Sequence, residues 1–169
     1  WRQQGVLETD LQQTEAELRA LYDCSPLGMF VCDNNASISY VNRTFREITG
    51  YNPQLSFEKV WTDYIYPDDK ENFNSQWKIL ENKPDTPIDI EIRFLNIESD
   101  ELIWINLRVS AIYIEKKLIG FLGTADDISE RKKASTLLLG ERQVLEMIAR
   151  DLSSKHTLEG LMQMIESQI

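Results

Sequence analysis

Hydrophobic positions recur with a helical period at the start of the chain. The seam they form consists of Leu7, Leu11, Thr14, Leu18 and Leu21. Steps of four and three residues place such a seam on one face of a helix, so a helix is predicted over residues 3–22. A helix this short is not stable alone in water. The seam is therefore expected to pack on the domain or on the same helix of a second chain.

Two short apolar runs follow this helix and predict a β-hairpin. They cover residues 29–32 and 38–41, and the polar residues 33–36 lie between them. Asn and Asp in such a stretch tolerate turn conformations and bond to their own backbone. The hairpin is therefore expected to supply the first two strands of the sheet.

Three further strands are predicted in the second half of the chain. Apolar residues occupy every second position over residues 88–94 and 103–111, which is the period of a strand with one buried face. The third strand is expected over residues 118–125, broken by Gly120 and Gly123.

Small helices are predicted between the hairpin and these strands. Asn42 stands at a helix N-cap, ahead of Phe45 and Ile48, and Gly50 follows as the helix stop. A helical turn is expected at residues 57–61.

A longer helix is predicted to begin at Pro67-Asp68-Asp69, where acidic residues favour the helix dipole. Its buried face consists of Phe73, Trp77 and Leu80. Strands, then small helices, then strands indicate an α+β fold, with helices on one face of a five-stranded antiparallel sheet.

The chain is predicted to turn helical again after Asp127. An apolar stripe contains Leu137, Leu138, Val144, Leu145, Ile148 and Leu152. Ser153-Ser154 is expected to interrupt this helix, and a second short amphipathic helix is predicted over residues 157–169.

Four stretches of this sequence together resemble the PAS family. They are the segment 38–51 with its Asn cap and Gly-Tyr ending, Tyr66-Pro67-Asp68-Asp69, Glu91 and Arg93 with Trp104, and Gly120 and Gly123 followed by residues 127–133. Two departures are Ser129 where the family signature has Thr, and Ser99-Asp100-Glu101 in place of an Asp-Gly turn.

The resemblance implies a division of the chain into three parts. Residues 1–23 form an N-terminal helix that caps the domain or makes a dimer, and residues 24–133 form the PAS sensor domain. Residues 134–169 form a helical linker that is similar to the opening helices of GAF domains.

The junction after the last strand is the expected output point. Asp127 can cap the exit helix while Glu130, three residues on, reaches back as in a capping box. The resemblance implies that Asp127, Ile128 and Ser129 transmit the signal from the sheet to this helix.

A ligand pocket is expected between the sheet and the small helices. Its candidate residues are Phe45, Ile48, Trp77, Glu91, Arg93, Ile105, Leu107 and Val109. Two arrangements remain open at this stage. If Ile90 and Ile92 face this side, the core is apolar. If Glu91 and Arg93 face it, the site is charged and suits a small polar ligand, because buried charges persist only when paired.

The cofactors typical of the family are not expected here. Residues 52–66 contain no Cys for a covalent flavin or a thioester chromophore, and residues 68–82 contain no His for a haem iron. The single His, His156, lies in the tail. A non-covalent small ligand remains open. No metal site, phosphate-binding loop or nucleophile motif is recognisable, so no catalytic residue is assigned and the fragment is not expected to be an enzyme.

Composition and charge narrow the expected partners. The net charge of −10 argues against nucleic-acid binding, which relies on clustered Lys and Arg. No apolar run reaches the roughly 18–20 residues that cross a bilayer, so no membrane contact is expected in this fragment. Cys24 and Cys32 are interpreted as reduced thiols of a cytoplasmic protein.

The expected function is sensing or relay within a larger signalling protein. A homodimer through the terminal helices and an output domain in the same chain are the expected partners. By resemblance the parent is a sensor histidine kinase of a two-component system. A diguanylate cyclase or phosphodiesterase, and a ligand-free dimerisation spacer, are the alternatives. The ligand, the output domain and the parallel or antiparallel sense of the dimer are not determined by the sequence.

Overall fold

The computed structural model describes residues 2–55 and 60–166 and has an α+β architecture, as predicted. The elements in chain order are α1 (Arg2–Asp23), β1 (Gly28–Cys32), β2 (Ile38–Val41), α2 (Arg43–Thr49), a 3₁₀ turn (Trp61–Tyr64), α3 (Pro67–Asn82), β3 (Ile88–Leu95), β4 (Leu102–Ile114), β5 (Lys117–Asp127) and α4 (Ser129–Glu166). The strands form one sheet in the order β2-β1-β5-β4-β3, and every neighbouring pair is antiparallel.

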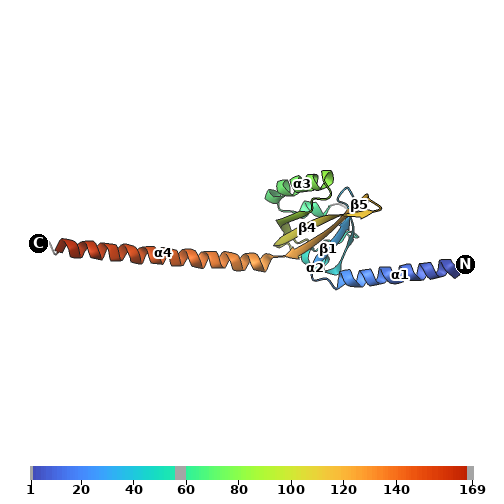
Figure 1. Ribbon diagram of the computed structural model, residues 1–169. Coiled ribbons are helices and arrows are strands. Elements are labelled where there is room, and N and C mark those ends of the chain that lie inside the picture. Colours follow the sequence, from blue (N-terminus) through green and yellow to red (C-terminus); the bar gives the residue numbers. More distant parts are fainter. Residues whose placement is uncertain (1, 56–59, 167–169) are drawn as a thin grey trace. The chain divides into compact units, whose positions relative to one another are not determined.

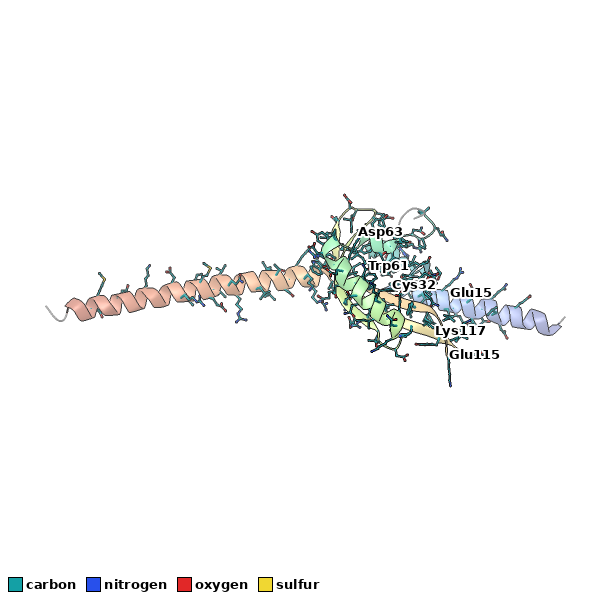
Figure 2. All side chains as sticks on the ribbon, turned by 90° about the horizontal axis from the view of Figure 1, so that it is seen from above. Glu15, Cys32, Trp61, Asp63, Glu115 and Lys117 are labelled. Carbon is teal, nitrogen blue, oxygen red and sulfur yellow. The ribbon has the colours of Figure 1, made fainter. Side chains whose placement is uncertain are left out.

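The core lies between one face of this sheet and the small helices (Figure 1). Alternate residues of the strands supply the sheet side, among them Phe30, Ile92, Leu107, Val109 and Phe121. The helices supply Phe45, Trp61, Phe73, Trp77 and Leu80. Figure 2 shows Cys32 and Trp61 in the interior of the domain, where both are buried. The apolar residues of the period-2 patterns in β3 and β4 thus lie on the face of the sheet that meets the helices.

Local signals place the small helices as predicted. Asn42 caps α2, and Gly50 ends it with a φ of 68°, in the left-handed region that glycine adopts without strain. Pro67 occupies the first turn of α3 together with Asp68 and Asp69. Most of the helical turn predicted at residues 57–61 lies outside the described residues.

The two glycines of β5 do not break the strand, contrary to the prediction. Gly120 lies beside the register shift between Ile112 and Tyr113, where the ladder absorbs one extra residue. Gly123 pairs with Phe30 of β1, and the Phe30 ring fills the space that a Cβ at residue 123 would need. Glycine at position 123 thus makes room for a core aromatic ring inside a continuous strand.

The C-terminal segment is one helix, so the predicted interruption at Ser153-Ser154 and the separate helix from residue 157 are wrong. Serine inside a helix costs only about 0.5 kcal/mol relative to alanine, and the residues on either side of this pair, Leu152 and Lys155, have good helix propensity. The chain divides into two compact units, residues 1–129 and residues 130–169. Within α4, exposed apolar side chains include Leu137, Leu138, Val144, Leu145 and Ile148.

The leucine seam of α1 is also exposed in this chain. Leu11, Leu18 and Leu21 have exposed fractions of 69%, 45% and 69%, and Leu7 lies outside the described side chains. Both cysteines are free thiols, and burial raises the pKa of the Cys32 thiol to about 12. A search of the described residues found no helix apolar and long enough to cross a membrane.

Candidate signal-relay site at the sheet-to-helix junction

The last residues of the sheet are tied to β4 through Trp104. The Trp104 carbonyl accepts a hydrogen bond from the Ile128 amide at 2.9 Å, and the Trp104 amide donates to Ser129 Oγ at 3.0 Å. Ile128 itself is buried. These contacts hold the end of β5 against the neighbouring strand β4.

Asp127 orders the first turn of the exit helix. Its Oδ1 accepts a hydrogen bond from the Ser129 amide at 2.9 Å, which satisfies a backbone donor that a helix start leaves unpaired. The predicted return contact from Glu130 is absent from the hydrogen bonds of the described residues. Glu130 instead accepts from Lys133 Nζ at 2.9 Å, because Lys133 lies one turn away on the same face.

The Arg93 side chain of β3 connects Trp104 to α3, and Arg93 with Asp69, Tyr66 and Trp104 is called the cation cluster. Arg93 stands opposite Trp104 in the β3–β4 register. Its guanidinium donates to Asp69 Oδ2 at 2.9 Å and Oδ1 at 2.8 Å, while its amide donates to Asp69 Oδ2 at 2.7 Å. Its Cζ lies 4.1 Å from the ring centroid of Tyr66 and 5.5 Å from that of Trp104. The start of α3 is thus fixed to β3, and the Arg93 side chain links it to the Trp104 ring of β4.

Electrostatics within the cluster favours the charged pair. The hydrogen bond from the Arg93 side chain lowers the pKa of Asp69, and it outweighs the partial burial that would raise that pKa. Because the contact is a two-pronged guanidinium–carboxylate pair, it also fixes the orientation of the Arg93 side chain. Asp69 is therefore ionised and holds the arginine between the two aromatic rings.

A second set of contacts, the entrance tether, lies where the chain enters the sheet and consists of the hydrogen bonds of Asn42. This residue is fully buried. Its Oδ1 accepts hydrogen bonds from the amides of Met29 at 2.7 Å and Phe45 at 2.9 Å. Its Nδ2 donates to the carbonyls of Tyr22 at 2.7 Å and Leu27 at 3.0 Å. One side chain therefore joins the end of α1, the start of β1 and the start of α2.

The predicted pocket residues do not all face one side of the sheet. Phe45, Trp77, Ile105, Leu107 and Val109 are buried in one core, and Ile48 packs against it. Glu91 is exposed and Arg93 is half-buried, while Ile92 between them is buried. Successive strand residues point to opposite faces, so Glu91 and Arg93 lie on the face away from the core. Of the two arrangements left open, the structure has the apolar one.

Aromatic rings occupy the region where the pocket was expected. Trp61 contacts Phe30 at 5.2 Å and Phe73 at 5.3 Å between ring centroids. Trp77 extends the cluster, with its centroid 5.6 Å from Phe73 and 5.4 Å from Phe121. Trp61 is the largest fully buried side chain of the described residues, and its Nε1 donates to the Ala36 carbonyl at 3.1 Å.

Sequence reasoning did not single out several of these residues as candidates for the site. Asp69 was interpreted only as a helix-start charge, and Trp61 only as part of a short turn. The Asp69–Arg93 contact joins residues 24 positions apart, which no local periodicity reveals. The available signal was the occurrence of Asp69, Arg93 and Trp104 in two of the stretches that carry the family resemblance.

Comparisons with known proteins agree with this architecture. A family profile described as the PAS fold matches residues 38–125, just over half of the chain. The PAS domain of an HTR-like protein from Haloarcula marismortui superposes with a TM-score of 0.60 at 21% identity, covering 73% of this chain and 99% of that one. A sensory box histidine kinase/response regulator from Burkholderia thailandensis gives a TM-score of 0.56 at 22% identity, covering 71% and 90%.

Curated relatives match over a small part of their own length. The bacterioopsin transcriptional activator of Halobacterium salinarum is 30% identical over 135 residues, which is 75% of this chain and 19% of that protein. The methyl sulfide methyltransferase-associated sensor of Methanosarcina acetivorans is 28% identical over 145 residues, which is 83% and 14%. The chain spans less than a fifth of the curated relatives it matches. Because the profile match covers just over half of the chain, from β2 into β5, the chain belongs to the PAS family of sensory domains.

Proposed function

We propose that this PAS domain relays a signal through its sheet into α4, within a larger signalling protein. The observation that carries the proposal is the pair of hydrogen bonds between Trp104 and residues 128 and 129. Because β4 pairs with both β3 and β5, a change in either the helices or the sheet reaches this point. The helix that leaves the sheet is the outlet of the signal.

The hydrogen bonds of Asn42 also connect α1 to the sheet, so the relay has an input helix as well as an output helix. Asn42 bonds the last turn of α1, and β1 pairs with β5 from Gly28 to Cys32. A displacement of α1 therefore acts on β1 and, through one strand pairing, on β5. Coupling between two such sites typically amounts to about 1–3 kcal/mol, which is enough to shift an output equilibrium severalfold.

A homodimer through the terminal helices is part of this proposal. The exposed leucines of α1 and the exposed apolar stripe of α4 support it, since apolar seams on helices are usually buried against another helix. In such a dimer, a rotation of one α4 relative to its partner would carry the output.

For the parent protein we propose a sensor histidine kinase. The similarity to a sensory box histidine kinase and to a curated sensor supports this assignment. A diguanylate cyclase or phosphodiesterase is the alternative output. The aromatic cluster in the core favours a relay without a ligand, or a dimerisation spacer, over a sensor of a bulky ligand. The absence of a covalent flavin and of a His-ligated haem stays a prediction.

The proposal is tested by autophosphorylation of the full-length protein. Ser129→Ala removes the hydroxyl that accepts from the Trp104 amide and keeps the Asp127 contact, so we expect the basal rate to change severalfold. Ser110→Ala, at an exposed position of β4, the strand that carries Trp104, is the matched control and should keep the wild-type rate. Equal rates in all three proteins would contradict the relay. An unphosphorylated parent would contradict the histidine kinase.

A further inference from the structure

A groove of about 580 Å³ runs along the free edge of the sheet. Its floor is formed by all four residues of β2 (Ile38–Val41). Arg19 and Asp23 of α1 and Arg46 of α2 contribute to its walls, together with residues 52–54. Because β2 is a terminal strand, this groove gives access to backbone groups that no other strand of the sheet covers.

The hydrogen-bond pattern of β2 leaves outward donors and acceptors. The Asn42 amide donates to the Met29 carbonyl at 2.9 Å, so this position faces β1. Antiparallel strands alternate, and the amide and carbonyl of Val41 therefore point away from β1. Val41 is only 6% exposed overall, but it is among the residues that line the groove. Apart from the strand pairings, the amide and carbonyl of Val41 make no backbone hydrogen bond with any described residue.

The opposite edge of the sheet is partly covered. On β3, the Arg93 carbonyl accepts from the Tyr66 amide at 2.9 Å, and the Arg93 amide donates to Asp69 at 2.7 Å. Phe94 also forms a bridge with Ile65. The two edges thus differ, because the domain's own residues occupy part of the β3 edge while a groove follows the whole of β2.

The charge of the groove differs in sign from that of the chain. Asp23 is engaged, since its Oδ1 accepts from the Arg43 amide at 3.1 Å. Arg46 has no ion-pair partner among the described residues, and the Arg19–Glu15 pair at 3.2 Å is exposed, so it restrains the Arg19 charge weakly. Both arginines also act on the Tyr40 hydroxyl, where they oppose the rise in pKa that burial and Asp23 produce. Two guanidinium groups therefore flank the edge strand in a protein of net charge −10.

We propose that this groove binds an extended acidic segment of a partner protein, which adds to the sheet as a strand beside β2. Main-chain bonds to the strand edge would supply affinity, and carboxylates near Arg19 and Arg46 would supply specificity. A strand that covers β2 needs about four residues, since each rises by about 3.3 Å. The site is separate from the exit junction at residues 127–129 and would bring a partner next to the α1 tether.

The test is a titration of the whole 169-residue chain with a blocked hexapeptide of alternating valine and glutamate, followed by amide NMR. We expect binding at about 1 mM or tighter, with shifts confined to β2, the end of α1 and residues 52–54. The double variant Arg19→Glu, Arg46→Glu should weaken binding at least about tenfold. Arg108→Glu, at an exposed arginine on β4 outside the groove, should leave it unchanged.

Variants of the peptide separate strand addition from other modes of binding. N-methylation of alternate peptide amides should abolish binding, because it removes the donors for the strand edge. Replacing glutamate by lysine should weaken binding at least about tenfold. Equal binding of the N-methylated peptide, full competition by free glutarate, or no shift at about 1 mM would each overturn the proposal. Glutarate competition would indicate a small-anion site instead.

Discussion

Replacement of Asn42 by alanine should destabilise the domain far more than an ordinary surface change. The side chain makes four hydrogen bonds while fully buried, to backbone groups of Met29, Phe45, Tyr22 and Leu27. Each bond contributes about 1 kcal/mol net, and unpaired groups left behind in the interior add to the loss. We expect a decrease of about 3–4 kcal/mol in the free energy of unfolding, a large part of the roughly 5–15 kcal/mol typical of a domain.

The assay is urea unfolding followed by tryptophan fluorescence, since Trp61 and Trp77 are buried. Asn42→Ser keeps a hydroxyl that can cap α2 and should recover about 1 kcal/mol of the loss. Asn82→Ala is the control, because that exposed side chain makes one hydrogen bond, to the Lys78 carbonyl at 2.8 Å, and should cost less than about 0.5 kcal/mol. A loss in Asn42→Ala no greater than in Asn82→Ala would refute the tether.

Two further predictions concern the cation cluster and the proposed dimer. The Arg93 hydrogen bond lowers the pKa of Asp69 in the folded state. The ionised Asp69 therefore stabilises the fold at pH values above its unfolded-state pKa of about 3.8, and this stabilisation is lost as the pH falls through the folded-state pKa. The difference in unfolding free energy between wild type and Asp69→Asn should therefore shrink between about pH 6 and pH 3, and a constant difference would contradict the assignment. The double variant Leu11→Glu, Leu18→Glu should raise the dissociation constant of the dimer at least about tenfold in sedimentation equilibrium. The control Leu55→Glu, at an exposed loop position, should leave this constant unchanged. An unchanged constant in the double variant would exclude α1 from the interface.

Local chemistry allowed much of the fold to be predicted from the sequence. The hairpin strand 38–41 and the helix between Asn42 and Gly50 follow from turn residues, an N-cap and a helix-ending glycine, which act over a few positions. The buried face of α3 follows from Phe73, Trp77 and Leu80 at helical spacing. These signals are local, so one sequence is enough to identify them.

Contacts between distant segments were the part that the sequence left open. The alternation in β3 was clear, but which set of alternate residues faced inward depended on the helices packed above it. The structure turns Ile92 inward and leaves Glu91 exposed. The donor bonds from Asn42 to Tyr22 and Leu27 likewise depend on how α1 meets β1, which the N-cap signal does not specify. The predicted break at Ser153-Ser154 failed because a weak local preference does not stop a helix.

The sheet-to-helix relay is tested most directly by amide hydrogen exchange at Ser129 and at residues 132–135 in Asp127→Ala and Asp126→Ala. Asp127 caps the Ser129 amide, whereas the side chain of its exposed neighbour Asp126 has no hydrogen bond among the described residues. Loss of about 1 kcal/mol at the cap predicts exchange about fivefold faster at the start of α4 in Asp127→Ala alone, with the β4 amides unchanged. Equal rates in the two variants, or equal acceleration throughout β4, would contradict a discrete junction between the sheet and the exit helix.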